Sequence, residues 1–106
     1  MPKYLLQGSY TPDGVKGLLR DGGTGRRTAI EGALGALGGK LESIYYAFGD
    51  TDVFVIIEVP DNVSAAALAL GVGATGLVGV KTTVLLTIEE IDQAGKTTIN
   101  YRGPGA

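Results

Sequence analysis

The chain has 106 residues, 44% of them hydrophobic and 19% charged, which fits one globular domain and excludes a disordered or membrane-spanning sequence. Its net charge is −2 and Arg26-Arg27 is its only basic pair, so it lacks the concentrated basic face that nucleic acids require. The absence of cysteine and histidine excludes disulfides and thiolate nucleophiles and removes the commonest general base and metal ligand, so we expect no metal and no cofactor.

The first half of the sequence predicts a strand, an interrupted helix and a second strand. Residues 3–10 form the first strand, and the segment TPDG (11–14) stops it and begins a helix, because proline is tolerated in the first helical turn and Thr or Asp can cap it. The segment DGG (21–23) interrupts this helix, which resumes with apolar residues at helical spacing until Gly38-Gly39 ends it. Residues 40–48 are the second strand.

The second half predicts a strand, a helix, a strand and a tail. The run VFVIIEV (53–59) is almost continuously apolar, as in a central strand covered on both faces. Asp61 or Asn62 caps a helix over residues 63–71, rich in alanine and leucine, and the last strand covers residues 78–88. Residues 89–92 form a short helical turn. We place the domain at 1–95 and a C-terminal tail or arm at 96–106.

The order strand, helix, strand, strand, helix, strand predicts a ferredoxin-like α+β fold, βαββαβ, with a four-stranded antiparallel sheet and both helices on one face. The opposite face then carries Phe54 and Ile56 without cover, an apolar patch of the kind that monomers avoid. We therefore expect a homodimer or a higher homo-oligomer.

Five segments along the chain resemble the GYD-domain family of the dimeric α/β-barrel superfamily: MPKYLLQGSYTPDG, GGKLESIYYAFG, DVFVIIEVPDNVSAAALAL, VKTTVLLTIEEID and YRGPGA. The naming turn, G-x-Y-D, falls on Gly49, Asp50, Thr51 and Asp52, with Thr51 where the family has tyrosine. The resemblance implies a subunit whose sheet packs face to face with a second copy around a barrel-like cavity. It implies no particular activity.

Candidate binding residues lie on the uncovered face. Pairing Phe48 with Val53 across a four-residue turn puts Tyr45 on the face that bears Phe54 and Glu58, whereas a turn one residue different would put Tyr46 there. The first strand adds Gln7 and Ser9 as candidates. Glu58 is the one charged residue in its strand. If it reaches the dimer cavity, it lies near Lys81, Gln7 or Ser9. A carboxylate in such a place can have a raised pKa and serve as a base. The alternative is a salt-bridged or solvated Glu58 at the strand end. The predicted ligand-binding residues are Tyr45, Phe54, Glu58, Ser9 and Gln7.

Three other motifs have ordinary interpretations. Asp50 and Asp52 are a carboxylate pair that could serve acid–base chemistry, but Asp in a turn more often bonds its own backbone. The segment 71–76 matches G-x-G-x-x-G, yet it follows a helix and precedes a strand, so we interpret it as a loop. The segment GGTGRR (22–27) opens a helix and could hold an anion, or it is a kink followed by solvated arginines.

Three functions fit these features. The first is a homodimeric protein that binds or senses a small molecule between the two sheets. The second is a cofactor-free barrel enzyme of the monooxygenase, isomerase or decarboxylase type using Glu, Asp or Tyr, and the third is a purely structural or assembly role. The mostly aliphatic inner face favours the first and third over an enzyme. No export signal or bilayer span is evident, so we expect a cytoplasmic protein without membrane contact.

Overall fold

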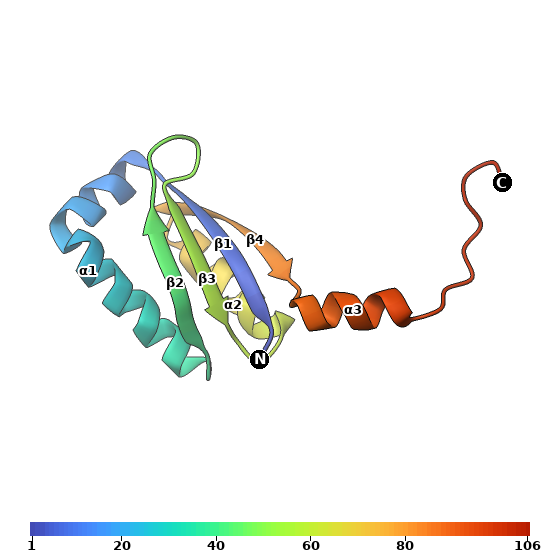
Figure 1. The fold of residues 1–106 in the computed structure, drawn as a ribbon. Coiled ribbons are helices and arrows are strands. Elements are labelled where there is room, and N and C mark those ends of the chain that lie inside the picture. Colours follow the sequence, from blue (N-terminus) through green and yellow to red (C-terminus); the bar gives the residue numbers. More distant parts are fainter.

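The computed structural model describes residues 1–106 and has the predicted ferredoxin-like α+β fold. Its four strands form one antiparallel sheet in the order β2-β3-β1-β4, with α1 and α2 on the same side of it (Figure 1). The fold class predicted from the sequence is therefore confirmed. The elements are β1 (Lys3–Tyr10), α1 (Pro12–Ala36), β2 (Lys40–Tyr46), β3 (Val53–Glu58), α2 (Asn62–Ala74), β4 (Val78–Leu85) and α3 (Ile88–Lys96).

The hydrophobic core lies between the sheet and the two helices. In β1 and β3 the side chains alternate, so that every second residue is buried on the helix side and its neighbours face the other way. Removing each of these side chains from water stabilises the fold by about 1.5–3 kcal/mol. The buried core consists of Tyr4, Leu6, Leu34, Val53, Val55, Ile57, Val59 and Ala65.

Both helices that cover the sheet begin at the caps that the sequence indicates. Thr11 Oγ1 accepts a hydrogen bond from the backbone N–H of Gly14 at the start of α1, and Asp61 Oδ1 accepts one from Ser64 at the start of α2. The predicted break in α1 falls at Gly22, whose φ of 72° lies in the left-handed region that favours glycine. The kink is confirmed.

The turn between β2 and β3 is longer than predicted. Strand β2 ends at Tyr46, which pairs with Val53, whereas the sequence prediction paired Phe48 with Val53. The N–H of Ala47 bonds to the carbonyl of Asp52, and the N–H of Asp52 bonds to the carbonyl of Gly8, so residues 47–52 form a closed loop tied to β1. The shift of two residues leaves Ser43 and Tyr45 on their predicted face, because side chains alternate with a period of two. A β-bulge between Leu41 and Ser43 then moves Leu41 to the helix side, opposite Ile57.

Three further element boundaries differ from the prediction. Helix α2 extends to Ala74, and β4 ends at Leu85. The expected short turn at 89–92 is instead the helix α3, because Thr87 and Glu90 form a capping box at its start: the N–H of Thr87 bonds to Glu90 Oε1 and the N–H of Glu90 bonds to Thr87 Oγ1.

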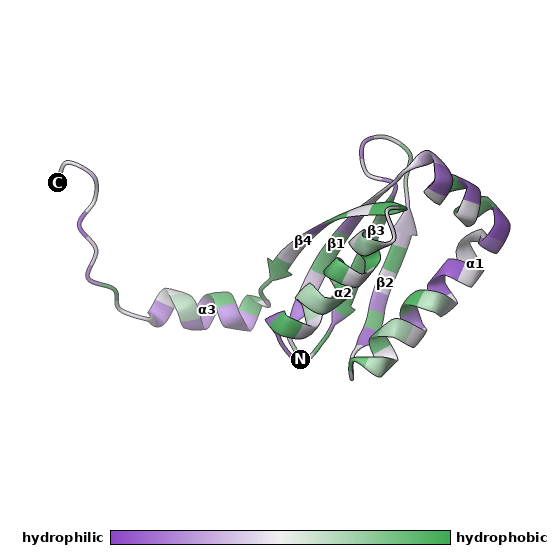
Figure 2. Ribbon diagram, turned by 180° about the vertical axis from the view of Figure 1, so that it is seen from behind, coloured by the Kyte–Doolittle hydropathy of each residue, from purple (hydrophilic) through white to green (hydrophobic).

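Helix α3 and the residues after it project away from the sheet, as Figures 1 and 2 show from opposite sides. None of the residues of α3 is buried. The chain has no helix that combines the length and the apolar character needed to cross a membrane.

Candidate functional site

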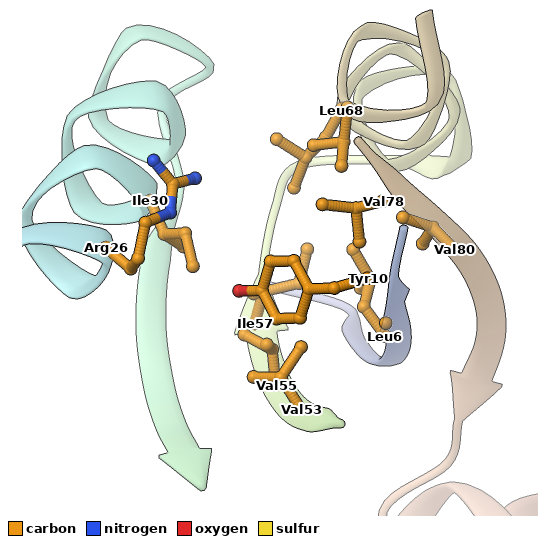
Figure 3. Close-up of a pocket in the computed structure, with 12 residues that line it drawn as sticks. Leu6, Tyr10, Arg26, Ile30, Val53, Val55, Ile57, Leu68, Val78 and Val80 are labelled. Carbon is orange, nitrogen blue, oxygen red and sulfur yellow. The ribbon is translucent and has the colours of Figure 1, made fainter. Parts of the chain in front are cut away.

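A groove runs along the helix side of the sheet between α1 and α2 (Figure 3). Its deeper part is an apolar cavity of about 70 Å³. Ile30 of α1 forms one wall and Leu68 and Val72 of α2 form the other. The floor is made by side chains from the three strands β1, β3 and β4, namely Leu6, Val53, Val55, Ile57, Val78 and Val80.

Polar groups gather at one end of this groove. Figure 3 shows the hydroxyl of Tyr10 directed toward the side of the groove where Arg26 of α1 lies. A second cavity of about 180 Å³ shares Tyr10, Arg26 and Val72 with the first and is also lined by Asp21 and Thr75. The two cavities therefore form one groove that is apolar along its floor and polar at its end.

The charge at the polar end is partly neutralised. Arg26 Nη1 lies 3.4 Å from Asp21 Oδ2, and the Arg26 side chain is 33% exposed. An ion pair at this exposure contributes little to stability, so the guanidinium can exchange Asp21 for another anion at small cost. A planar guanidinium can also donate two parallel hydrogen bonds to a carboxylate.

Tyr46 of β2 lies beside Tyr10 and near Arg26 but lines neither cavity. Burial raises the pKa of Tyr46, the hydrogen bond with Tyr10 raises it further, and the nearby charge of Arg26 opposes both only in part. The Tyr46 hydroxyl is therefore protonated at neutral pH. It can donate a hydrogen bond to a ligand but cannot act as a base.

Local sequence features position these side chains. The kink at Gly22 divides α1, and the segment after it carries Arg26 and Ile30 one turn apart on the same side of the helix. Gly8 of β1 lies in the floor, where a Cβ atom would come 2.7 Å from Cγ1 of Val53. A side chain at position 8 would therefore displace a floor residue.

The ligand-binding residues predicted from the sequence lie on the opposite, uncovered face of the sheet. Tyr45, Phe54 and Gln7 are direct cross-strand neighbours, and Lys81 of β4 completes the row. Tyr45 is 73% exposed and Phe54 is 37% exposed. The structure therefore brings three of the five predicted residues together.

The other two predicted residues lie at opposite ends of that face. Glu58 is not near Lys81, Gln7 or Ser9, as the sequence suggested; its oxygens lie 3.6 Å from Nζ of Lys3 and 3.5 Å from Nζ of Lys40. Burial alone would raise the pKa of Glu58, but the attraction of the two lysines outweighs burial and lowers it. The salt-bridged alternative is the one observed, and Glu58 is a poor proton acceptor at neutral pH.

The turn of Gly49, Asp50 and Asp52 has a structural role. Asp52 Oδ2 accepts a hydrogen bond from the backbone N–H of Tyr10 at 2.8 Å, and the backbone carbonyl of Asp50 accepts one from Ser9 Oγ at 2.7 Å. Asp52 therefore bonds the backbone of β1, and not the backbone of its own turn as the sequence suggested. No group of three or more acidic side chains lies close enough together to hold a metal ion.

The sequence analysis did not identify Tyr10 and Arg26 as groove residues. A signal for Arg26 was present, because it precedes Ile30 by four residues and so extends the apolar stripe of the helix toward its start. Alternation along β1 puts Tyr10 on the same face as Tyr4 and Leu6, but the sequence does not indicate that α1 and α2 leave a groove above that face.

Element order, sheet topology and the position of the helices place the chain among ferredoxin-like α+β proteins. A sequence model of the GYD domain matches residues 4–94, and the chain therefore belongs to the GYD-domain family. No curated protein matches the chain. No solved structure matches it either.

Proposed function

We propose that this GYD-domain protein is a homodimer that binds or senses a small molecule, and that the ligand occupies the α1–α2 groove of each subunit. The observation that carries this proposal is the groove itself, a concave apolar site with a few convergent polar groups at one end. That combination is typical of small-molecule sites in proteins.

The groove favours a small ligand with an apolar body and an anionic head. Cavities of about 70 and 180 Å³ accommodate roughly one aromatic ring or a short aliphatic chain, since an apolar cavity of about 150 Å³ holds benzene. Arg26 would pair with a carboxylate, and the hydroxyl of Tyr10, which is directed toward the Arg26 side of the groove, would donate a hydrogen bond to it.

Dimer formation is supported by the uncovered face of the sheet. Tyr45 and Phe54 lie next to each other there, and Ile56 and Leu5 make up the adjacent row. This apolar patch, which lies among the polar residues Gln7, Lys81 and Ser9 of the same face, favours association with a second copy. This assembly leaves the groove accessible, because the groove is on the opposite side of the sheet.

Binding is favoured over catalysis by the state of the titratable groups. Glu58 is ionised and held by two lysines, and Tyr46 is protonated, so neither has a pKa suited to proton transfer near neutral pH. The cofactor-free enzyme considered from the sequence would need such a group.

Benzoate combines a single ring with a carboxylate and is a direct probe of the groove. We expect a titration of the ¹⁵N-labelled protein with benzoate to produce saturable shifts at the amides of Ile30, Val72 and Tyr10. Arg26→Gln should weaken benzoate binding about tenfold or more, because a hydrogen bond to a charged group contributes roughly 1.5–3 kcal/mol. Benzyl alcohol, the neutral analogue, should be insensitive to that substitution.

Arg27→Gln is the matched control, since Arg27 is adjacent in sequence, equally charged and exposed, and does not line the groove. It should leave benzoate binding within a factor of two of the unmodified protein. Saturable shifts confined to β2 and β3 residues of the uncovered face would contradict the groove as the site. If Arg26→Gln and Arg27→Gln weaken benzoate binding equally, Arg26 acts only through the net charge of the protein, and this would contradict a direct contact between Arg26 and the carboxylate.

A further inference from the structure

Helix α2 has an apolar outer surface that nothing in its own chain covers. Its sequence, NVSAAALALGVGA, contains no charged residue, and Figure 2 shows it as predominantly hydrophobic along its length. Ala65 and Leu68 face the sheet, whereas Val63 is 77% and Leu70 is 73% exposed on the opposite side. A helix that is apolar all round is normally buried on all sides. The exposed residues of this outer surface are Val63, Ala66, Ala67, Leu70 and Ala74.

Helix α3 also has an apolar side that nothing in its own chain covers. Its two isoleucines are three positions apart and lie on one side of the helix, with Ile88 78% and Ile91 54% exposed. Its acidic residues and Lys96 lie mainly on the other side. A helix of nine residues is marginal in water by itself, so it needs an apolar surface against which to pack.

The start of α3 directs it away from its own domain. The capping box of Thr87 and Glu90 fixes the first turn, and Leu86 and Ile91 occupy the two positions of a hydrophobic staple, which sets the angle at which the chain enters a helix. Figures 1 and 2 show that α3 then continues outward from the end of β4. Local interactions therefore place α3 where it can meet another molecule.

We propose that α3 of one copy packs across the outer surface of α2 of a second copy, that the exchange is reciprocal, and that this contact is separate from the one proposed for the uncovered sheet face, which lies on the opposite side of the sheet from α2. The apolar side of α3 then covers the apolar outer surface of α2. Because the exchange is reciprocal, a twofold axis relates the two copies and neither copy is left with an unpaired α3. The small residues Ala66, Ala67 and Ala74 of α2 allow the backbone of the arriving helix to approach closely. This inference does not depend on a ligand in the groove.

The segment that follows β4 is long enough to reach beyond its own domain. It comprises residues 86–106. Apolar residues continue beyond α3, where Ile99 is 76% and Tyr101 is 72% exposed. These side chains extend the apolar surface that a second copy can cover.

Cross-linking tests the exchange, because the natural chain has no cysteine. The double variant Leu70→Cys/Ile91→Cys, treated at micromolar concentration with a short bismaleimide, should give a product of twice the chain mass on a denaturing gel. Leu70→Cys/Gln93→Cys is the matched control, since Gln93 lies on the polar side of α3. The double-mass product should be at least fivefold less abundant with the control pair.

Two outcomes would overturn the proposal. A product that is internally cross-linked and migrates at the mass of one chain would mean that α3 folds back onto its own α2. If the two cysteine pairs gave equal yields of the double-mass product, the cross-link would arise from random collisions between copies and not from a defined contact between α3 and α2. A full-length Ile91→Lys variant, in which the helix caps are unchanged, should raise the dissociation constant of the assembly tenfold or more by light scattering; an unchanged constant would also contradict the exchange.

Discussion

The carboxylate of Asp52 accepts a hydrogen bond from the backbone N–H of Tyr10 at a distance of 2.8 Å. This contact joins the loop after β2 to the last residue of β1, 42 positions earlier in the sequence. Tyr10 contributes its ring to the α1–α2 groove, so the aspartate of the family's turn supports the groove through the backbone and does not line it. The loop after β2 thus helps to position the residue that ends β1 beside it.

Removing this support should destabilise the protein. Asp52→Ala leaves the N–H of Tyr10 without its partner, and we expect the free energy of unfolding in urea to fall by about 1.5–3 kcal/mol, because the acceptor is charged. Asp50→Ala is the control, since the contact that Asp50 makes with Ser9 uses its backbone carbonyl. Equal losses in the two variants would mean that the loop, and not the Asp52–Tyr10 bond, is what matters.

A second contact ties α2 to the sheet. The hydroxyl of Tyr4, which is 1% exposed, donates a hydrogen bond to Asn62 Oδ1 at 2.6 Å. Tyr4→Phe removes the donor without changing the ring, and we expect a loss of about 1 kcal/mol in the free energy of unfolding. Tyr45→Phe alters an exposed ring on the uncovered face and should change stability by less than half as much; a larger effect there would contradict this account.

The ion pairs of Glu58 predict how stability depends on pH. Lys3 and Lys40 lower the pKa of Glu58 below its ordinary value of 4.5 in the folded state, so its contribution is fully present above pH 4.5 and is lost as the pH falls through the lowered pKa. We expect unmodified protein and Glu58→Gln to differ in thermal midpoint at pH 7. The difference should shrink steadily below pH 4.5, and a difference that grows on acidification would show that the pKa is raised instead.

The state of Tyr46 can be measured by ultraviolet absorbance. Burial and the contact with Tyr10 raise the pKa of Tyr46 above its ordinary value of 10.0, so its phenolate should form later in an alkaline titration than that of a solvated tyrosine. The difference between unmodified protein and Tyr46→Phe isolates this group. A difference spectrum with a midpoint at or below pH 10 would contradict the raised pKa of Tyr46.

Much of the fold could be predicted because local signals agree with the tertiary structure. Proline and threonine at the start of α1, glycine at its kink and the unbroken apolar run of β3 each have one ready structural interpretation. The end of β2 could not be predicted, because the loop at 47–52 is closed by bonds to β1, a contact distant in sequence. The groove could not be predicted for the same reason, because it depends on how far apart α1 and α2 lie over the sheet, and local sequence patterns do not specify that distance.

The predicted site residues also divide into those set by local alternation, which were placed correctly, and those set by contacts between strands, which were not. Alternation along the strands correctly placed Tyr45, Phe54 and Gln7 on one face. The partners of Glu58 were predicted wrongly, because register along the neighbouring strands decides that Lys3 and Lys40, and not Lys81, lie beside it. Side-chain faces follow from a period of two, whereas particular neighbours require the register.

The most direct test of the proposed function is a crystal structure of the full-length protein soaked with benzoate. We predict two copies packed through the uncovered sheet faces, with the benzoate ring between Ile30 and Val72 and its carboxylate on Arg26 in each copy. Benzoate bound between the two sheets, with the α1–α2 groove empty, would contradict the groove as the ligand site.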